Sequence, residues 1–140
     1  MMYFAYGANL DKIPMRQRCP GAVLVGQALL QGYRLVAMRE GWLSIAPEND
    51  SSVHGLLWHL QPTDWPPLDT YEGLEDGLYS RNLLEVHHTE LVATDPVQAI
   101  VYIGNNSGPG RLRPEYATRV ERAAAQTLGP TPAAQIRGLA

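Results

Sequence analysis

The order of the expected elements constrains the fold of this chain more than any other feature, because strand patterns come first and helical patterns last. Segments rich in β-branched and aromatic residues are separated by glycine and other turn-forming residues. We expect strands at residues 3–7, 22–38, 43–47, 53–60, 79–86 and 97–103. Residues 22–38 could form two strands or one long strand bent at Gly26 and Gly32.

Turns and helices are expected between and after these strands. The polar run 48–52 and the segment near Thr94-Asp95-Pro96 are typical of turns. We expect a weak helix ending near Arg16, a helical turn from residue 63 to Glu72, and helices at 114–127 and 132–136. The sequence therefore predicts an α+β fold: one domain over residues 1–140, with a mixed β-barrel of about five to seven strands flanked by short helices.

Composition excludes several classes of protein. Apolar residues make up 45% of the chain and charged residues 18%, which is typical of a globular domain. A net charge of -3 with a single lysine argues against a nucleic-acid partner, which needs clustered positive charge. No stretch approaches the roughly 20 apolar residues that cross a bilayer, so we expect no membrane partner. Met1–Leu10 also lacks a basic export signal, and the lone Cys19 fits a reducing cytoplasm.

The chain shows no pattern typical of a metal or cofactor site. His87 and His88 are adjacent on an expected strand, so they point to opposite faces, and so do His54 and His59. The phosphate-binding Gly-Lys-Ser/Thr signature and the Gly-x-Ser-x-Gly nucleophile elbow are both absent. Cys19 lacks an adjacent base and is interpreted as a packing residue. We therefore expect neither metal nor cofactor.

The segment Tyr6-Gly7-Ala8-Asn9-Leu10 is the first candidate binding element. An expected strand ends here in small residues and turns toward a helix, which frees several backbone N–H groups to point at one spot. Such a turn could hold an anionic group of a ligand. It could equally be an ordinary connection between a strand and a helix.

Tyr71-Glu72-Gly73 is the second candidate element. Gly73 stands where a helix usually stops, so Glu72 is expected at the helix C-terminus, facing the negative end of the dipole. Together with burial beside Tyr71 and Tyr79, this placement would favour the protonated form and raise the pKa of Glu72 toward neutrality. The alternative is a solvated glutamate that supports the turn.

Together, these motifs resemble the γ-glutamylcyclotransferase-like family. The resemblance is carried by residues 3–10, by residues 68–73 and by Gly77-Leu78-Tyr79. Weaker matches are Gly32-Tyr33-Arg34, Val53-His54-Gly55 and Pro114-Glu115-Tyr116. The matches follow one another in the same order over nearly the whole chain.

The resemblance implies an enzyme and assigns roles to particular residues. It implies that Glu72 is the catalytic acid/base, and that the substrate-binding residues are Tyr6, Gly7, Ala8, Asn9, Leu10, Tyr79, Tyr102 and Tyr116. Serine is more common in the family at the position of Ala8, so a hydroxyl contact is lost there. The implied fold is a small barrel, and the implied partner is a small-molecule γ-glutamyl substrate.

The implied chemistry needs no metal and no covalent intermediate. The α-amine of a γ-glutamyl compound attacks its own γ-carbonyl and closes the five-membered lactam 5-oxoproline, expelling the acceptor amine. A non-catalytic module that binds a small metabolite or a protein in the same cleft is the competing reading. The glycine-rich segment 104–110 could act as a lid over the cleft.

Overall fold

The computed structural model describes residues 1–89 and 95–140. In this part of the chain, five strands close into a barrel in the order β1-β3-β2-β4-β5. The strands are β1 (Met2–Ala5), β2 (Val23–Ala37), β3 (Leu43–His59), β4 (Tyr79–His88) and β5 (Val97–Gly104). β1 runs parallel to β5, and the other pairs are antiparallel. The expected α+β fold with a mixed barrel is confirmed, at the lower end of the expected strand number.

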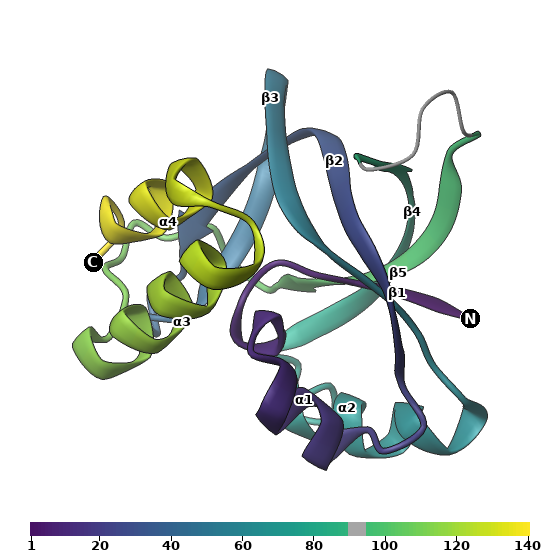
Figure 1. The fold of residues 1–140 in the computed structure, drawn as a ribbon. Helices are drawn as coiled ribbons and strands as arrows, with labels where there is room; N and C mark the ends of the chain where they lie inside the picture. The colour runs from purple at the N-terminus through teal and green to yellow at the C-terminus, as the bar shows by residue number, and fades with distance from the viewer. Residues whose placement is uncertain (90–94) are drawn as a thin grey trace.

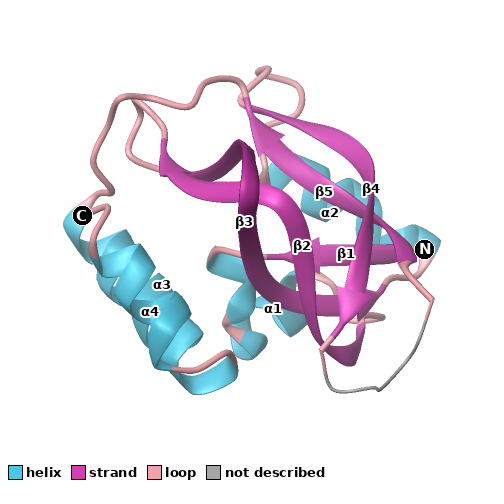
Figure 2. Ribbon diagram, turned by 90° about the horizontal axis from the view of Figure 1, so that it is seen from above, coloured by secondary structure: helices cyan, strands magenta, loops and turns pink. Residues whose placement is uncertain are grey.

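Helices cover two regions of the barrel (Figure 1). The short helices α1 (Lys12–Arg18) and α2 (Trp65–Tyr71) lie at one end, together with the 3-10 turns η1 (Ala8–Leu10) and η2 (Pro62–Asp64). α3 (Pro114–Thr127) and α4 (Pro130–Arg137) pack against each other at the side, as Figure 2 shows from above. No helix in the described residues is long and apolar enough to cross a membrane.

β2 is one long strand rather than two. Its pairing with β3 is irregular between Leu24 and Gly26 and again between Gln31 and Tyr33. Gly26 and Gly32 stand at these two places with φ of 152° and 84°, values that side chains disfavour. Of the two alternatives left open by the sequence, the long strand bent at glycines is the correct one.

The prediction of a turn at residues 48–52 is wrong, because the single strand β3 continues through these residues. Gln31 pairs with Ser52 and Tyr33 with Pro47, so the polar residues between them form an irregularity within a single strand. Asp50 has a φ of 64° at this place. The residues before and after this segment both pair with β2, and this pairing keeps the segment within the strand although its local composition favours a turn.

The helix expected at residues 114–127 matches α3, and the expected strands 79–86 and 97–103 correspond to β4 and β5. α4 is longer than the piece expected at 132–136, because Pro130 occupies its first position. α1 begins after Asp11 and extends to Arg18. The turn expected near Thr94-Asp95-Pro96 lies partly outside the described residues, which exclude Thr94.

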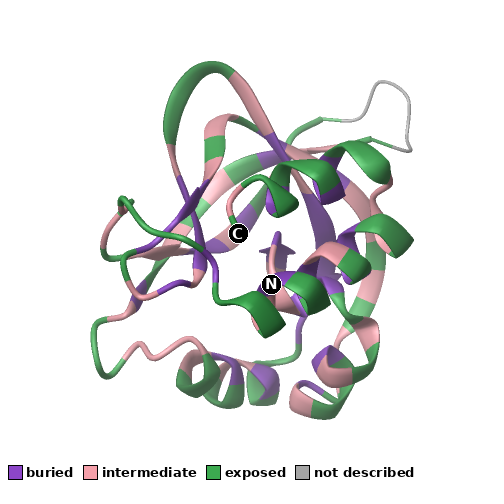
Figure 3. Ribbon diagram, turned by 90° about the vertical axis from the view of Figure 1, so that its left-hand side faces the viewer, coloured by how far each residue is buried: buried purple, intermediate pink, exposed green. Residues whose placement is uncertain are grey.

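The core is continuous through the barrel and beneath the helices. Trp58 and Phe4 are the largest fully buried side chains, and both lie on the paired strands β1 and β3. Figure 3 shows buried residues on the strands and on the helix faces turned toward the barrel. β1 is buried from Tyr3 onward, so the turn that follows it is anchored in the core.

Candidate active site

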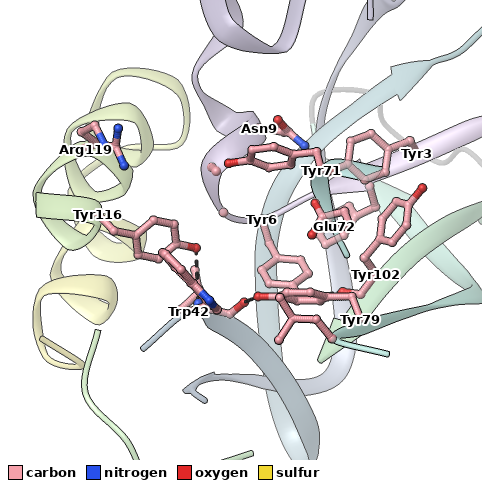
Figure 4. A pocket seen from close by; sticks show the side chains of 15 residues that line it. Tyr3, Tyr6, Asn9, Trp42, Tyr71, Glu72, Tyr79, Tyr102, Tyr116 and Arg119 are labelled. Atoms are coloured by element: carbon pink, nitrogen blue, oxygen red, sulfur yellow. Dashed lines mark hydrogen bonds between the residues drawn. The ribbon is translucent and has the colours of Figure 1, made fainter. Parts of the chain in front are cut away.

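A pocket of about 260 Å³ opens where the turn after β1, the end of α2, and α3 meet (Figure 4). This volume lies just below the range of about 300–1,000 Å³ that is typical of drug-sized ligand sites, so it suits a small ligand. Its walls are mainly aromatic. The lining residues are Tyr3, Phe4, Tyr6, Gly7, Ala8, Asn9, Trp42, Leu43, Tyr71, Glu72, Leu78, Tyr79, Tyr102, Tyr116 and Arg119.

The turn after β1 presents backbone donors to this pocket. The N–H groups of Gly7, Ala8 and Asn9 have no hydrogen-bond partner among the described residues, and all three residues line the pocket. The Leu10 N–H instead donates to the Gly7 carbonyl at 3.0 Å, and the Leu10 side chain is fully buried in the core. The structure therefore brings Tyr6 through Asn9 to the pocket but not Leu10, whose amide closes the 3-10 turn.

Gly7 lines the pocket opposite Tyr116 and Leu43. A Cβ at this position would lie 3.5 Å from the Tyr116 hydroxyl and 3.7 Å from Leu43. Any side chain larger than a methyl group would enter the space between the turn and α3. The glycine therefore allows close approach of a ligand to the backbone.

Glu72 is positioned by the end of α2. Its backbone N–H donates to the Leu68 carbonyl at 3.0 Å, and Gly73 follows with a φ of 66° that ends the helix. Burial against the pocket wall raises the pKa of Glu72 from 4.5 to about 7. The nearby Arg18 works against this rise, and Asp69 adds to it. The expected helix-end position and raised pKa are both present, with burial as the largest cause.

Tyrosine hydroxyls surround Glu72 and differ in what they can offer a ligand. Tyr6 donates to the Tyr102 carbonyl at 2.6 Å and Tyr79 to the Leu43 carbonyl at 2.5 Å, so each presents lone pairs to the pocket. Tyr116 accepts from the Leu43 N–H at 3.3 Å and keeps its own proton to donate. Burial raises the pKa of all three hydroxyls, so they remain protonated at neutral pH.

Asp69 and Arg81 fix one side of the pocket. Tyr102 donates to Asp69 at 2.6 Å, and Arg81 makes two hydrogen bonds to the same carboxylate. The carboxylate of Asp69 is thus fully engaged and holds the Tyr102 ring in place. Burial, followed by this acceptor, raises the pKa of Tyr102. The Tyr102 hydroxyl proton is therefore engaged by Asp69, and the residue forms part of the pocket wall.

Arg18 connects the opening turn to α2. Its guanidinium lies 3.4 Å from the centroid of the Tyr71 ring and donates to the Asn9 side-chain oxygen. Asn9 in turn donates to the Tyr3 hydroxyl at 2.9 Å. The side chain of Asn9 is therefore committed to this network, and only its backbone can serve a ligand.

The sequence missed several lining residues. Tyr3 and Tyr71 stand beside predicted site residues, so the two motifs themselves carried the signal. Trp42 lies just before β3 and Arg119 lies on α3, and no local pattern distinguishes either of them. Only the barrel and the packing of α3 bring these two residues to the pocket.

Two other sequence features lie away from the pocket. None of residues 104–110 lines it, and this segment packs against residues 37–40, where a Cβ at Gly110 would lie 2.1 Å from the Met38 carbonyl oxygen. Cys19 is buried, and burial raises the pKa of its thiol to about 11, which suits a packing role. The described residues contain no group of three or more His, Cys, Asp or Glu side chains placed to hold a metal.

Comparison with known proteins identifies the family. A family model described as gamma-glutamyl cyclotransferase, AIG2-like, matches residues 3–122, which is most of the chain. The chain belongs to this family. The mouse and cattle gamma-glutamylcyclotransferases are 32% and 30% identical to it over 88 residues. Each match covers 56% of this chain and 47% of the relative, so the chain spans about half the length of the curated relatives it matches.

Solved structures show the same fold. A gamma-glutamyl cyclotransferase superposes with a TM-score of 0.87 at 21% identity, covering 100% of this chain and 88% of that one. The Bacillus subtilis protein YkqA superposes with a TM-score of 0.81 at 20% identity, covering 99% of this chain and 53% of that one. The family resemblance inferred from residues 3–10, 68–73 and 77–79 is confirmed.

Proposed function

We propose that this chain is a γ-glutamylcyclotransferase that converts the glutamyl part of a γ-glutamyl compound to 5-oxoproline and releases the amine, with Glu72 as general acid/base. One observation carries the proposal. A carboxylate with a pKa of about 7 lies in the same pocket as the unpaired backbone amides of Gly7 and Ala8. A proton-transfer group is most effective when its pKa lies near the working pH.

The reaction moves protons from the α-nitrogen of the substrate to the acceptor nitrogen, and one carboxylate can transfer them. Glu72 in its ionised form takes a proton from the α-ammonium group of the substrate. The freed amine attacks the γ-carbonyl carbon, and the carbonyl π electrons move to its oxygen. Collapse of this intermediate breaks the bond to the acceptor nitrogen, which takes the proton back from Glu72. The new ring nitrogen still carries one extra proton, which Glu72 takes and gives to the released amine, so that 5-oxoproline and an ammonium ion leave. The contribution expected from such acid/base catalysis is about 10²–10⁴-fold in rate.

The remaining pocket groups have complementary roles in this proposal. Tyr6 and Tyr79 present hydroxyl lone pairs, which suit the α-ammonium group of the substrate. The amides of Gly7 and Ala8 and the free proton of Tyr116 are donors, which suit a carboxylate or a developing oxyanion. We assign the backbone N–H of Asn9 to the same group of donors, and Tyr102 to the wall of the pocket.

We also propose that residues 1–140 act as one domain, in the cytoplasm, on a small-molecule substrate. The continuous core supports a single folding unit. The one cysteine, which is buried, supports a reducing compartment.

The rate of lactam release should depend on pH through Glu72. The ionised form is the base that starts the reaction, so kcat/KM is expected to fall about tenfold for each pH unit below about 7 and to level off above it. The measurement is kcat/KM for γ-glutamyl-alanine from pH 5 to 8. A profile that stays flat across this range would contradict the assignment of Glu72 as base.

Arg18 should influence the pH at which kcat/KM begins to fall, which we call the acid limb of the profile. Its positive charge works against the pKa rise at Glu72, so Arg18→Met is expected to move the limb to higher pH. Arg18→Lys retains the charge and should restore most of the wild-type position. An unchanged limb in Arg18→Met would show that the guanidinium serves only to hold Tyr71 and Asn9.

Product analysis distinguishes the proposed enzyme from a binding module. We expect the purified chain, mixed with γ-glutamyl amino acids and γ-glutamyl amines, to release 5-oxoproline detectable by mass spectrometry. Tight binding of these compounds without lactam release would favour the module instead. A structure with 5-oxoproline bound would then test whether Glu72 lies within hydrogen-bond distance of the ring nitrogen.

A further inference from the structure

The pocket changes in character from its inner end to its mouth. The inner end holds Glu72 among buried tyrosines. The mouth is formed by Tyr71, which is 46% exposed, and by half-buried Trp42 and Tyr116, whose rings meet edge to face at 5.1 Å. In the proposed reaction the glutamyl group reaches Glu72, which leaves the outer rings as the contacts for the acceptor part of the substrate.

Arg119 is the charged group at this mouth. Of the described residues that line the pocket, only Glu72 and Arg119 carry charged side chains. Arg119 makes no ion pair or hydrogen bond with any described residue. By contrast, other arginines are engaged: Arg34 with Glu48, Arg81 with Asp69, Arg137 with Glu121 and Arg18 with Asn9.

The position of Arg119 on α3 directs it to the outer part of the pocket. It follows Tyr116 by three residues, so the two side chains share one face of the helix. Burial raises the pKa of Tyr71 and of Tyr116, and the positive charge of Arg119 works against the rise at both. Figure 4 shows Arg119 on the α3 side of the pocket, away from Glu72 and beyond Tyr116.

We propose that Arg119 binds a carboxylate carried by the acceptor amine, so that the chain prefers γ-glutamyl amino acids to γ-glutamyl amines that lack this group. The inference rests on the proposed function and adds the acceptor class to it. A guanidinium without a partner, beside two aromatic rings, provides the bidentate donors that a carboxylate needs. The rings contact the side chain of the acceptor, and the arginine binds the negative charge of its carboxylate.

The expected contribution of Arg119 to kcat/KM is small because its side chain is exposed to solvent. Arg119 is exposed, so solvent and salt screen its interaction with a bound carboxylate. We expect about a tenfold contribution to kcat/KM, which decreases as salt concentration rises. The effect should appear mainly in KM, because the carboxylate is bound equally before and during ring closure.

Two substrates that differ only in the acceptor carboxylate test the proposal. They are γ-glutamyl-alanine and γ-glutamyl-ethylamide. Wild-type protein is expected to use the first with about tenfold higher kcat/KM, and Arg119→Gln should lower this value to that of the ethylamide while leaving the ethylamide unchanged. Arg122→Gln is the matched control, because Arg122 lies on the same helix, is exposed and does not line the pocket.

The outcomes separate this inference from the proposed function. Two results would overturn this inference and leave the proposed function intact. The first is an active wild type with equal rates on both compounds. The second is an Arg119→Gln variant in which both rates are lowered together. The second result would place the glutamyl carboxylate on Arg119 instead. A wild type that releases 5-oxoproline from neither compound overturns both the proposed function and this inference. A loss in Arg122→Gln equal to that in Arg119→Gln would likewise overturn the specific role of Arg119.

Discussion

Replacing Glu72 with glutamine is expected to lower kcat for 5-oxoproline release by about 10²–10⁴-fold. The amide retains the size of the side chain and its place at the end of α2, but it can neither accept the α-ammonium proton nor return a proton to the leaving nitrogen. Binding of the product should persist, because the amides of Gly7 and Ala8 are unchanged. The measurements are single-turnover release of 5-oxoproline and its dissociation constant.

The same substitution should not destabilise the fold, and above pH 7 it should stabilise it. The pKa of Glu72 is raised from 4.5 to about 7, so between these values the folded protein holds a proton that the unfolded chain releases. The free energy of unfolding therefore falls as pH rises through this range. The glutamine avoids this cost, so we expect Glu72→Gln to be about 1–3 kcal/mol more stable at pH 8 and equal to wild type at pH 4.

Glu75→Gln is the matched control for both measurements. Glu75 is exposed, lies three residues further along the chain and does not line the pocket. Neither its turnover nor its stability should differ from wild type. If Glu72→Gln retained turnover within a few fold of wild type, another group would have to move the proton, and the assignment of Glu72 would be wrong.

The two motifs that form the site, at Gly7-Ala8 and Glu72-Gly73, could be predicted from the sequence because each depends on local backbone chemistry. Gly7 and Ala8 end a strand with small residues, and Gly73 ends a helix one residue after Glu72, so turn and cap preferences predict both positions. Their convergence on one pocket was not readable from local patterns. It depends on the barrel, in which β1 pairs with β3 and β5, and on the place of α2 at one end of it.

The remaining differences arise where tertiary contacts override local preference. Residues 48–51 have the composition of a turn, but the long hairpin of β2 and β3 keeps them within a strand. The Leu10 amide was expected to face the ligand, but it closes the 3-10 turn onto Gly7. Arg119 has an ordinary place in an amphipathic helix, and only the docking of α3 beside the turn gives it a place at the pocket.

Gly55→Ala is expected to destabilise the barrel strongly and to disturb the pocket as well. A Cβ at Gly55 would lie 2.4 Å from the Ala5 carbonyl oxygen and 2.6 Å from the Phe4 ring, so β1 would have to move away from β3. Overpacking of this kind costs about 3 kcal/mol when backbone must shift. β1 leads directly into Tyr6 and Gly7, so its displacement should also lower kcat/KM.

Gly138→Ala distinguishes this steric effect from the general effect of replacing a glycine. Gly138 has a φ of -64°, and a Cβ there would lie 3.5 Å from its nearest atom, so the variant should be as stable as wild type or slightly more stable. Urea unfolding of both variants provides the comparison. A Gly55→Ala protein with a wild-type midpoint would show that β1 and β3 can separate at little cost. The turn that presents Gly7 and Ala8 would then not depend on close packing at Gly55, and kcat/KM should be unchanged.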